Sequence, residues 1–233
     1  MLKSRDLQKA AQDFRYLLNH GYSRKASLEL VGNRYQLNSD QRHLLHRGVY
    51  SDADSASRHK RRLSVRKVRG KELAIDGYNV IITIEAGLAR RLLILGDDGF
   101  IRDISGLSGS YRRTERTEAA LRLILDALKK LKPSQTLFLF DAPISMSGAM
   151  AREVRALLKK ENLPGDAKAV KVPEKILTGY PGVVATSDTA VIDQSKNVLD
   201  LAGHILMQRN KLASFIQWNV RRGRSSRDFL QDT

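Results

Sequence analysis

Three aspartates each close a short apolar run of this sequence, and their placement suggests chemistry. The runs are LAI before Asp76, LFLF before Asp141 and GVVATS before Asp188. A short apolar run is typical of a buried parallel strand, and open α/β sheets bind ligands at the carboxyl ends of such strands. We therefore expect the three carboxylates to meet at one edge of a parallel sheet.

Carboxylates that lie close together repel one another, and a divalent cation relieves this repulsion. Mg²⁺ and Mn²⁺ prefer oxygen ligands, which water and substrate phosphate often complete. Such an ion can activate water for phosphodiester hydrolysis. We predict that Asp76, Asp141 and Asp188 are both metal ligands and catalytic residues, with Mg²⁺ or Mn²⁺ as cofactor. The alternative for the first run is an ordinary Asp76-Gly77 turn in which Asn79 caps a helix.

The chain after residue 70 alternates between strand and helix patterns, which predicts a three-layer α/β/α domain with a mostly parallel sheet. Residues 80–90 fit either a helix or a strand. Residues 91–95 and 100–104 flank the sequence GDDG, which predicts a hairpin with Asp97 and Asp98 in its turn. Further strands are predicted near 136–140, 167–172, 182–186 and 212–218, and helices over 114–131, 147–160 and 189–209, the last with a break near Ser195.

The first fifty residues predict three short helices, which make a small all-α domain. Apolar residues recur at helical spacing over 4–20. Ser23 can cap a second helix that stops at Gly32-Asn33, and Asn38 with Gln41 forms a capping-box pattern for a third. The interval from Gly32 to Asn38 is longer than the usual turn of a helix-turn-helix, so a plain helical module is preferred to that motif.

Positive charge predicts a polyanionic partner. The chain has 41 Lys and Arg against 25 Asp and Glu, a net charge of +16. Residues 1–70 hold 16 basic and 6 acidic residues, so +10 of this charge lies there and +6 in the rest. We predict a helical domain over 1–56, a basic linker over 57–70, an α/β domain over 71–220 and a basic tail over 221–233. In the linker, nucleic-acid contacts are expected from Arg61, Arg62, Arg66 and Lys67.

Cysteine is absent, which excludes disulfides, thiol catalysis and cysteine-ligated metal sites. The five histidines show no metal-ligand spacing and are interpreted as structural or solvated. No apolar run reaches the length of a membrane span, and the first residues lack the apolar core of a signal peptide. We therefore expect a cytoplasmic protein without a membrane partner.

The motifs IDGYN at Asp76, FDAP at Asp141 and ATSDTAVID around Asp188 together resemble the PIN-like nucleases, particularly the NYN branch. The resemblance covers residues 71–210. It implies a domain that binds Mg²⁺ or Mn²⁺ at its aspartates and hydrolyses RNA. On this resemblance Asn79, Thr186 and Ser187 are expected at the substrate. The whole chain also resembles a largely archaeal two-domain family of uncharacterised proteins.

The PIN-like pattern includes a further acid, and this sequence departs from it because no single residue fits that position. Asp193 is a candidate metal ligand or an exposed helix residue. Asp103 follows a predicted strand. Glu115 and Glu118 fall in the first turns of a predicted helix, where acids are favoured by the helix dipole alone.

The sequence thus predicts a divalent-metal-dependent ribonuclease, with RNA preferred to DNA as substrate. The alternative is a non-catalytic RNA-binding or scaffold protein that keeps the sheet for structural reasons. A phosphatase with an aspartate nucleophile fits poorly, because Tyr78 stands where that class has its second acid. Phosphate-binding glycine motifs of nucleotide-binding proteins do not follow any predicted strand.

Overall fold

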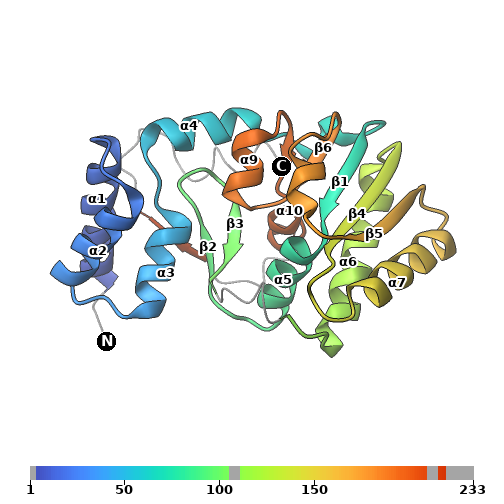
Figure 1. Ribbon diagram of the computed structural model, residues 1–233, viewed down its shortest axis with the longest axis horizontal. Helices are drawn as coiled ribbons and strands as arrows, with labels where there is room; N and C mark the ends of the chain where they lie inside the picture. Colours follow the sequence, from blue (N-terminus) through green and yellow to red (C-terminus); the bar gives the residue numbers. More distant parts are fainter. Residues whose placement is uncertain (1–3, 105–110, 209–214, 219–233) are drawn as a thin grey trace.

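The computed structural model describes residues 4–104, 111–208 and 215–218. Three helices gather at one end of the molecule, and a five-stranded sheet with its helices lies at the other, with a small second sheet between them (Figure 1). The basic tail predicted for residues 221–233 lies outside the described residues.

The larger sheet is parallel throughout, which confirms the predicted α/β class. Its strands are β1 (Glu72–Asp76), β4 (Gln135–Asp141), β5 (Gly165–Val170), β6 (Val183–Ala185) and β7 (Val198–Leu199). Their spatial order is β5-β4-β1-β6-β7. The chain therefore builds outward from β1 to β5, then returns across β1 to continue on its other side with β6. This reversal makes a switch point beside β1, where open α/β sheets form a ligand crevice.

Helices cover both faces of this sheet, as the alternation of side chains along β1 requires. Leu73 and Ile75 face a large core shared with α5 (Gly77–Leu88), α6 (Glu115–Leu131), α7 (Ser147–Lys160) and α10 (Leu201–Met207). Ala74 faces a smaller core formed with α8 (Pro173–Leu177) and α9 (Thr189–Gln194). The predicted three-layer architecture is confirmed.

Two details of this domain differ from the expectation. Residues 80–90, which fitted either a helix or a strand, lie mostly in α5. The break predicted near Ser195 in the helix from 189 to 209 is confirmed, but the chain forms the unpredicted strand β7 between α9 and α10. The two residues of β7 are too few to show a strand pattern in the sequence.

The second sheet contains β2 (Leu93–Leu95), β3 (Ile101–Asp103) and β8 (Phe215–Gln217). β2 and β3 pair antiparallel around Gly96–Gly99, which confirms the hairpin, and β8 runs parallel to β2. Ile94 from β2 and Trp218 pack into the core of the N-terminal helices. The small sheet therefore contributes apolar surface to the helical domain.

The predicted N-terminal helices are confirmed as α1 (Ser4–Asn19), α2 (Arg24–Arg34) and α3 (Ser39–Gly48). Ser23 caps α2, and Asn38 and Gln41 form the expected capping box of α3. α2 runs past its predicted stop, so the connection to α3 is only residues 35–38. Our objection to a helix-turn-helix, that this connection is too long, is therefore wrong.

The segment predicted as a basic linker is instead largely structured. Residues 57–61 lie in helix α4 (Asp52–Arg61), and residues 65–68 form the 3₁₀ helix η1 (Val65–Val68). Ser51 caps α4, its first turn is acidic and its last turn is basic, which is the arrangement that the helix dipole favours. The first basic residues of the predicted linker therefore complete a helix that begins in the helical domain.

Buried ion pairs join the helical domain to the α/β domain. Asp97 and Asp98 do occupy the hairpin turn, where Gly99 supplies a positive φ of 83°. Both carboxylates are nonetheless buried. Arg15 of α1 contacts both oxygens of Asp97 at 2.8 Å, and Arg102 of β3 contacts both oxygens of Asp98 at 2.7 and 2.8 Å.

Arg58 of α4 extends this ion-pair network. Its Nη1 lies 3.5 Å from Asp98, and its Nε and Nη2 lie 2.7 and 2.8 Å from the carboxylate of Asp193 in α9. The ring of Tyr50 packs beneath the guanidinium groups of Arg58 and Arg102, at 4.4 and 5.2 Å. Burial alone would raise the pKa of Asp98, but the neighbouring guanidinium groups outweigh it and hold that pKa below its ordinary value.

We predict that Asp98→Asn lowers the free energy of unfolding by about 3–5 kcal/mol, because it leaves the buried guanidinium group of Arg102 without its countercharge. The matched control is Glu118→Gln, which removes the acid of an exposed Glu118–Arg122 pair on α6. That control should cost at most ~0.5 kcal/mol. Urea unfolding of both variants measures the difference, and equal losses would contradict a structural role for the buried pair.

Candidate carboxylate site at the sheet edge

The three predicted aspartates lie at the same edge of the five-stranded sheet. Asp76 ends β1 and Asp141 ends β4. Asp76 pairs in register with Leu139, so Asp141 extends two residues further along the neighbouring strand. On the other side Ile75 pairs with Ala185, and the chain continues from there through Thr186 and Ser187 to Asp188. All three side chains are therefore delivered beside the switch point.

Gly77 explains why the first motif needs a glycine. A Cβ atom at this position would lie 2.3 Å from a ring carbon of Phe140 and 2.9 Å from the carbonyl oxygen of Leu139. Only glycine lets the first turn of α5 approach β4 this closely. This approach sets the positions of Tyr78 and Asn79 beside the sheet edge.

The Thr-Ser segment after β6 holds the site together. Thr186 Oγ1 donates a hydrogen bond to Asp76 Oδ2 at 2.8 Å and accepts one from the backbone N–H of Asp188 at 3.1 Å. Asn79 Oδ1 accepts hydrogen bonds from the N–H and the hydroxyl of Ser187, at 2.8 and 3.0 Å. Thr186 and Ser187 are both buried, and their hydrogen bonds position Asp76 and the loop that leads to Asp188. Their predicted contact with substrate stays a prediction.

The buried ion pairs reach this segment directly. Arg102, held by Asp98, donates from Nε to the carbonyl oxygen of Ser187 at 2.8 Å. Asp188 then begins α9, and its Oδ1 accepts hydrogen bonds from the N–H groups of Ala190 and Val191, at 2.8 and 3.1 Å. Asp188 is thus a helix cap as well as a candidate ligand, and one of its two oxygens is committed to the helix.

Burial and like charge raise the pKa values of the carboxylates at this edge. Burial raises the pKa of Asp76 to about 7, and the negative charges of Asp188 and Asp141 act in the same direction. Hydrogen bonds from Thr186 and from the backbone N–H of Asn79 partly offset this rise. The pKa of Asp141 is also raised, first by burial and then by the charge of Glu174.

Glu174 is an acid that the sequence analysis missed. It lies in the first turn of α8, directly after β5 brings the chain to the same edge of the sheet. Its signal in the sequence was weak, because the apolar strand pattern of β5 is interrupted by Asp166 and Lys168 and no acid ends that strand. A row of acids therefore follows the strand order, from Glu174 through Asp141 and Asp76 to Asp188.

The other acids considered for the site have different partners. Asp193 forms the ion pair with Arg58 and faces α4. Asp103 ends β3 of the small sheet, where Arg47 lies 3.6 Å from it. Glu118 pairs with Arg122 on the exposed side of α6, and Glu115 is exposed in the first turn of the same helix. None of these four belongs to a strand end of the five-stranded sheet.

Only some of the basic residues expected at the substrate lie far from the carboxylates. The backbones of Gly70 and Lys71 bond to Lys132 and Ser134, immediately before β4 begins. η1, which carries Arg66 and Lys67, therefore precedes the amino ends of the strands. Arg61 donates to the carbonyl oxygen of Ser195, and Arg62 pairs with the first residue of β7 at the side of the sheet. Five strand residues span roughly 16 Å, so Arg66 and Lys67 are separated from the carboxylates by the depth of the sheet.

The carboxylate oxygens at this edge are the type of ligand that a hard divalent cation prefers. Asp76, Asp141 and Asp188 supply carboxylate oxygens, and Mg²⁺ commonly uses one or two carboxylates together with water and substrate phosphate. Among the described residues, no three acidic or histidine side chains already converge closely enough to hold an ion. A cation at this edge would therefore need ligands from water or substrate as well as from the protein.

We predict a pH-dependent stability of the metal-free protein that originates at Asp76. Between about pH 4 and pH 7 the native carboxyl holds a proton that the unfolded chain has lost, so stability falls as the pH rises through this window. Measured in EDTA, the unfolding free energy of wild type should fall relative to that of Asp76→Asn. The difference should be on the order of 2 kcal/mol, since one pKa unit is worth about 1.4 kcal/mol and the site is partly open to water. Parallel pH profiles of the two proteins would show that Asp76 titrates normally.

We also predict that millimolar Mn²⁺ raises the melting temperature of wild type. An ion at one hundred times its dissociation constant stabilises the native state by about 2.7 kcal/mol. Asp76→Asn and Asp188→Asn should lose this response, whereas Glu118→Gln should keep it. If calorimetry shows no shift for wild type, the carboxylate edge does not bind the ion.

Comparisons with known proteins place the chain in a family. Residues 6–61 match the family described as "Protein of unknown function (DUF434)", and residues 65–204 match the "Domain of unknown function (DUF5616)". The chain is 33% identical over 197 residues to "Uncharacterized protein MJ0935" of Methanocaldococcus jannaschii, which covers 84% of this chain and 94% of that protein. No solved structure matches the chain. No helix in the described parts combines the length and the apolar character needed to cross a membrane. The chain belongs to the two-domain family, with an archaeal member, that joins an N-terminal DUF434 region to a DUF5616 domain.

Proposed function

We propose that this protein is a divalent-metal-dependent ribonuclease of the cytoplasm, and that Asp76, Asp141 and Asp188 form its catalytic site. The observation that carries the proposal is that the three aspartates follow the carboxyl ends of the neighbouring strands β4, β1 and β6, at the switch point of a parallel sheet. Structural proteins rarely gather carboxylates without cations beside them, because the like charges cost stability. The resemblance of the three motifs to PIN-like and NYN nucleases supports the same activity.

The residues divide into ligands and positioning groups. Asp76 is central, and Thr186 fixes its orientation through Oδ2. Asp188 Oδ1 is committed to α9, so we assign its Oδ2 to a ligand. A bound Mg²⁺ or Mn²⁺ would supply an activated water and neutralise charge on the phosphate. Asn79 and Ser187 hold the loop that presents Asp188.

RNA is the proposed substrate, and positive charge near the site supports an anionic chain. Lys171 follows β5 directly and Lys175 follows Glu174 in α8, and both side chains are exposed. Arg112 is exposed in the segment before α6. These cations can contact phosphates on either side of the carboxylates. They take the role that we first assigned to the segment at Arg61–Lys67.

The second candidate is a non-catalytic RNA-binding protein. One observation favours it, namely that the described acids do not converge into a closed set of metal ligands. In that case the repulsion between Asp76 and its neighbours is relieved by protonation of Asp76, whose pKa lies near neutrality. The two candidates differ in what happens when a single charge is removed at Asp188.

We predict that Asp188→Asn loses most RNA cleavage and keeps RNA binding. The amide preserves the cap of α9, because Asn is as good an N-cap as Asp, yet it is a poor metal ligand. Each ~1.4 kcal/mol of lost transition-state stabilisation lowers the rate tenfold, so a loss of a hundredfold or more is expected. Cleavage of an end-labelled single-stranded RNA with Mn²⁺, Mg²⁺ or EDTA measures the rate, and filter binding measures affinity.

Glu115→Gln is the matched control, since it removes an equal charge from an exposed acid that is not at the strand edge. Its cleavage rate should equal that of wild type. Cleavage that survives unchanged in Asp188→Asn would identify a contaminating nuclease and favour the binding protein. Loss of cleavage with binding retained would establish the hydrolase.

A further inference from the structure

A cavity of about 540 Å³ opens beside Asp141. Its walls are mostly apolar and include Tyr78, Tyr111, Ile144 and Met150, with Met146 and Arg112 toward the surface. Ile144 follows Asp141 in a tight turn in which its N–H bonds to the Asp141 carbonyl oxygen at 3.0 Å. Tyr78 comes two residues after Asp76 at the start of α5. Two residues of the cavity wall, Tyr78 and Ile144, therefore closely follow two of the three proposed catalytic aspartates, Asp76 and Asp141, in the sequence.

Aromatic rings form the inner wall of this cavity. The ring centroids of Tyr78 and Tyr111 lie 4.9 Å apart, and Tyr78 meets the edge of Phe140 at 5.1 Å. The hydroxyl of Tyr111 lies 2.8 Å from Thr117 Oγ1 and 3.1 Å from Glu85 Oε1. Thr117 in turn bonds to Glu85, whose carboxylate is buried in α5. The ring of Tyr111 is thus fixed in place before any ligand arrives.

No pattern in the sequence predicts this wall. Tyr78 and Tyr111 are 33 positions apart and neither belongs to a repeated aromatic pattern. They meet because α5 and α6 pack against each other, and Tyr111 lies in the segment just before α6. Tyr78 lies near the carboxylates because Gly77 lets the first turn of α5 approach β4 closely.

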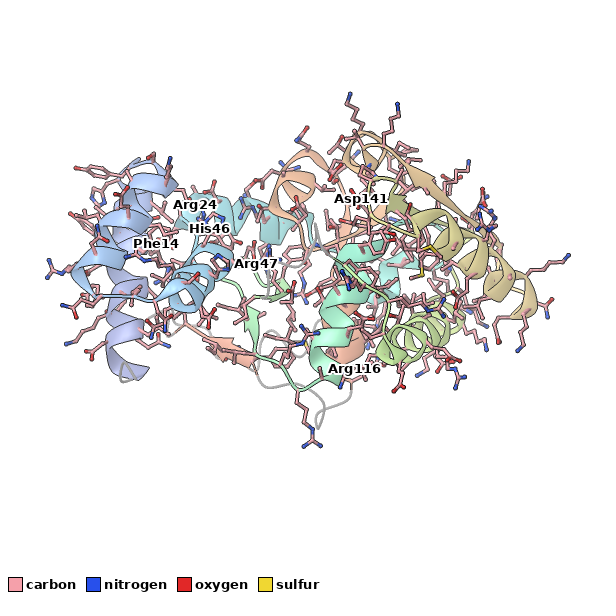
Figure 2. The ribbon with its side chains drawn as sticks, turned by 60° about the horizontal axis from the view of Figure 1, so that its bottom comes forward. Phe14, Arg24, His46, Arg47, Arg116 and Asp141 are labelled. Carbon is pink, nitrogen blue, oxygen red and sulfur yellow. The ribbon has the colours of Figure 1, made fainter. Side chains whose placement is uncertain are left out.

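The mouth of the cavity has the opposite character. Arg112 is exposed there, and no ion pair of its guanidinium is found among the described residues. Its neighbour Arg113 instead forms an ion pair with Glu153 of α7, which ties this segment to the far wall. Figure 2 shows that Asp141 lies well away from the cluster of Arg24, His46 and Arg47 in the helical domain. Arg112 is accordingly the cation of this cavity.

A ligand for this site needs a flat apolar part for the rings and an anionic part for Arg112 and the nearby cation-binding edge. A nucleotide has both parts. An inorganic anion would leave the apolar walls without a contact, and a neutral apolar molecule would leave Arg112 without one. An acyl chain with an anionic head could contact both, but it has no flat face to stack on the rings of Tyr78 and Tyr111. Aromatic walls also accept every base, because each base offers a π-face.

We propose that this cavity binds the base of a nucleotide adjacent to the cleaved phosphate, with Arg112 contacting the backbone. The role of the cavity in cleavage rests on the proposed function, whereas the binding of a nucleotide does not. The cavity then decides which phosphate is presented to Asp76, Asp141 and Asp188. Ribose and phosphate remain at the carboxylate edge while the base is removed from solvent.

The test measures binding of single nucleotides to the full chain in EDTA, by calorimetry and by NMR line broadening. The probes are AMP, GMP, CMP and UMP, with ribose 5-phosphate and inorganic phosphate as comparisons that lack a base. At least one nucleotide should bind ten times more tightly than ribose 5-phosphate. Equal affinity for both would overturn the proposal, because the apolar walls would then contribute nothing.

Three variants locate the binding. Ala149→Phe fills the cavity from α7 and should reduce nucleotide affinity tenfold or more. Arg112→Ala should weaken all phosphate-bearing probes, whereas its matched control Arg116→Ala, an exposed arginine of α6 outside the cavity (Figure 2), should behave as wild type. Met146→Glu changes an exposed residue at the mouth, so it keeps the fold, and it should repel the phosphate. Thermal melts check that each variant is folded.

These outcomes separate the cavity from the catalytic proposal. If Asp188→Asn retains nucleotide binding while cleavage is absent even in wild type, the cavity serves a binding protein and the ribonuclease fails alone. If wild type cleaves RNA and folded Met146→Glu and Ala149→Phe cleave and bind as wild type does, the cavity proposal is wrong while the ribonuclease stands.

Discussion

The ion pair between Arg102 and Asp98 is the interaction on which the rest of this structure depends. Both side chains are almost fully buried, at 2% and 0% exposure, and a buried charge is tolerated only when its partners are close and well aligned. Asp98 satisfies Arg102 through two hydrogen bonds, and Tyr50 covers the guanidinium. The remaining Nε bonds to the Ser187 carbonyl oxygen. One guanidinium thus connects the hairpin, the helical domain and the loop that presents Asp188.

This connection explains how the sheet edge holds like charges together. Repulsion among Asp76, Asp141 and Asp188 pushes the strand ends apart, and the loop after β6 is the least supported of them because β6 has only three residues. Thr186 ties that loop to Asp76, Asn79 ties it to α5, and Arg102 ties its carbonyl from the other side. The helical domain reaches the same point through Arg58 and Asp193. Contacts at the domain interface therefore stabilise a site whose neighbouring negative charges repel one another.

The sequence predicted the carboxylate edge because each aspartate directly follows an apolar run, a pattern that parallel topology converts into proximity. It could not predict Glu174, because the edge strand β5 alternates polar and apolar residues. Glu174 also does not end that strand but follows Pro173 at the start of α8. The hairpin was predicted, but the burial of Asp98 was not, because a GDDG turn is normally solvated. Here Arg102 of the same hairpin and Arg58 from a distant part of the chain surround its carboxylate. β7 was missed because two residues carry no period. The local pattern of apolar residues predicted the strands. Ion pairs formed in the folded chain determine which acids are already bound to arginines and which could bind a cation.

Net charge alone does not locate a polyanion-binding surface on this fold. Of the arginines that make the chain basic, Arg15, Arg58 and Arg102 neutralise buried aspartates and cannot reach a phosphate. The exposed cations of η1 lie at the amino edge of the sheet, so an RNA that touched both η1 and the carboxylates would have to cross the depth of the domain. A strand of RNA is long enough to do so, since each nucleotide adds several ångströms and screening limits the direct attraction to about 8–10 Å. If RNA is the substrate, long-range attraction and local positioning are therefore separate tasks in this fold, and the proposal assigns the second to the few cations near Asp141.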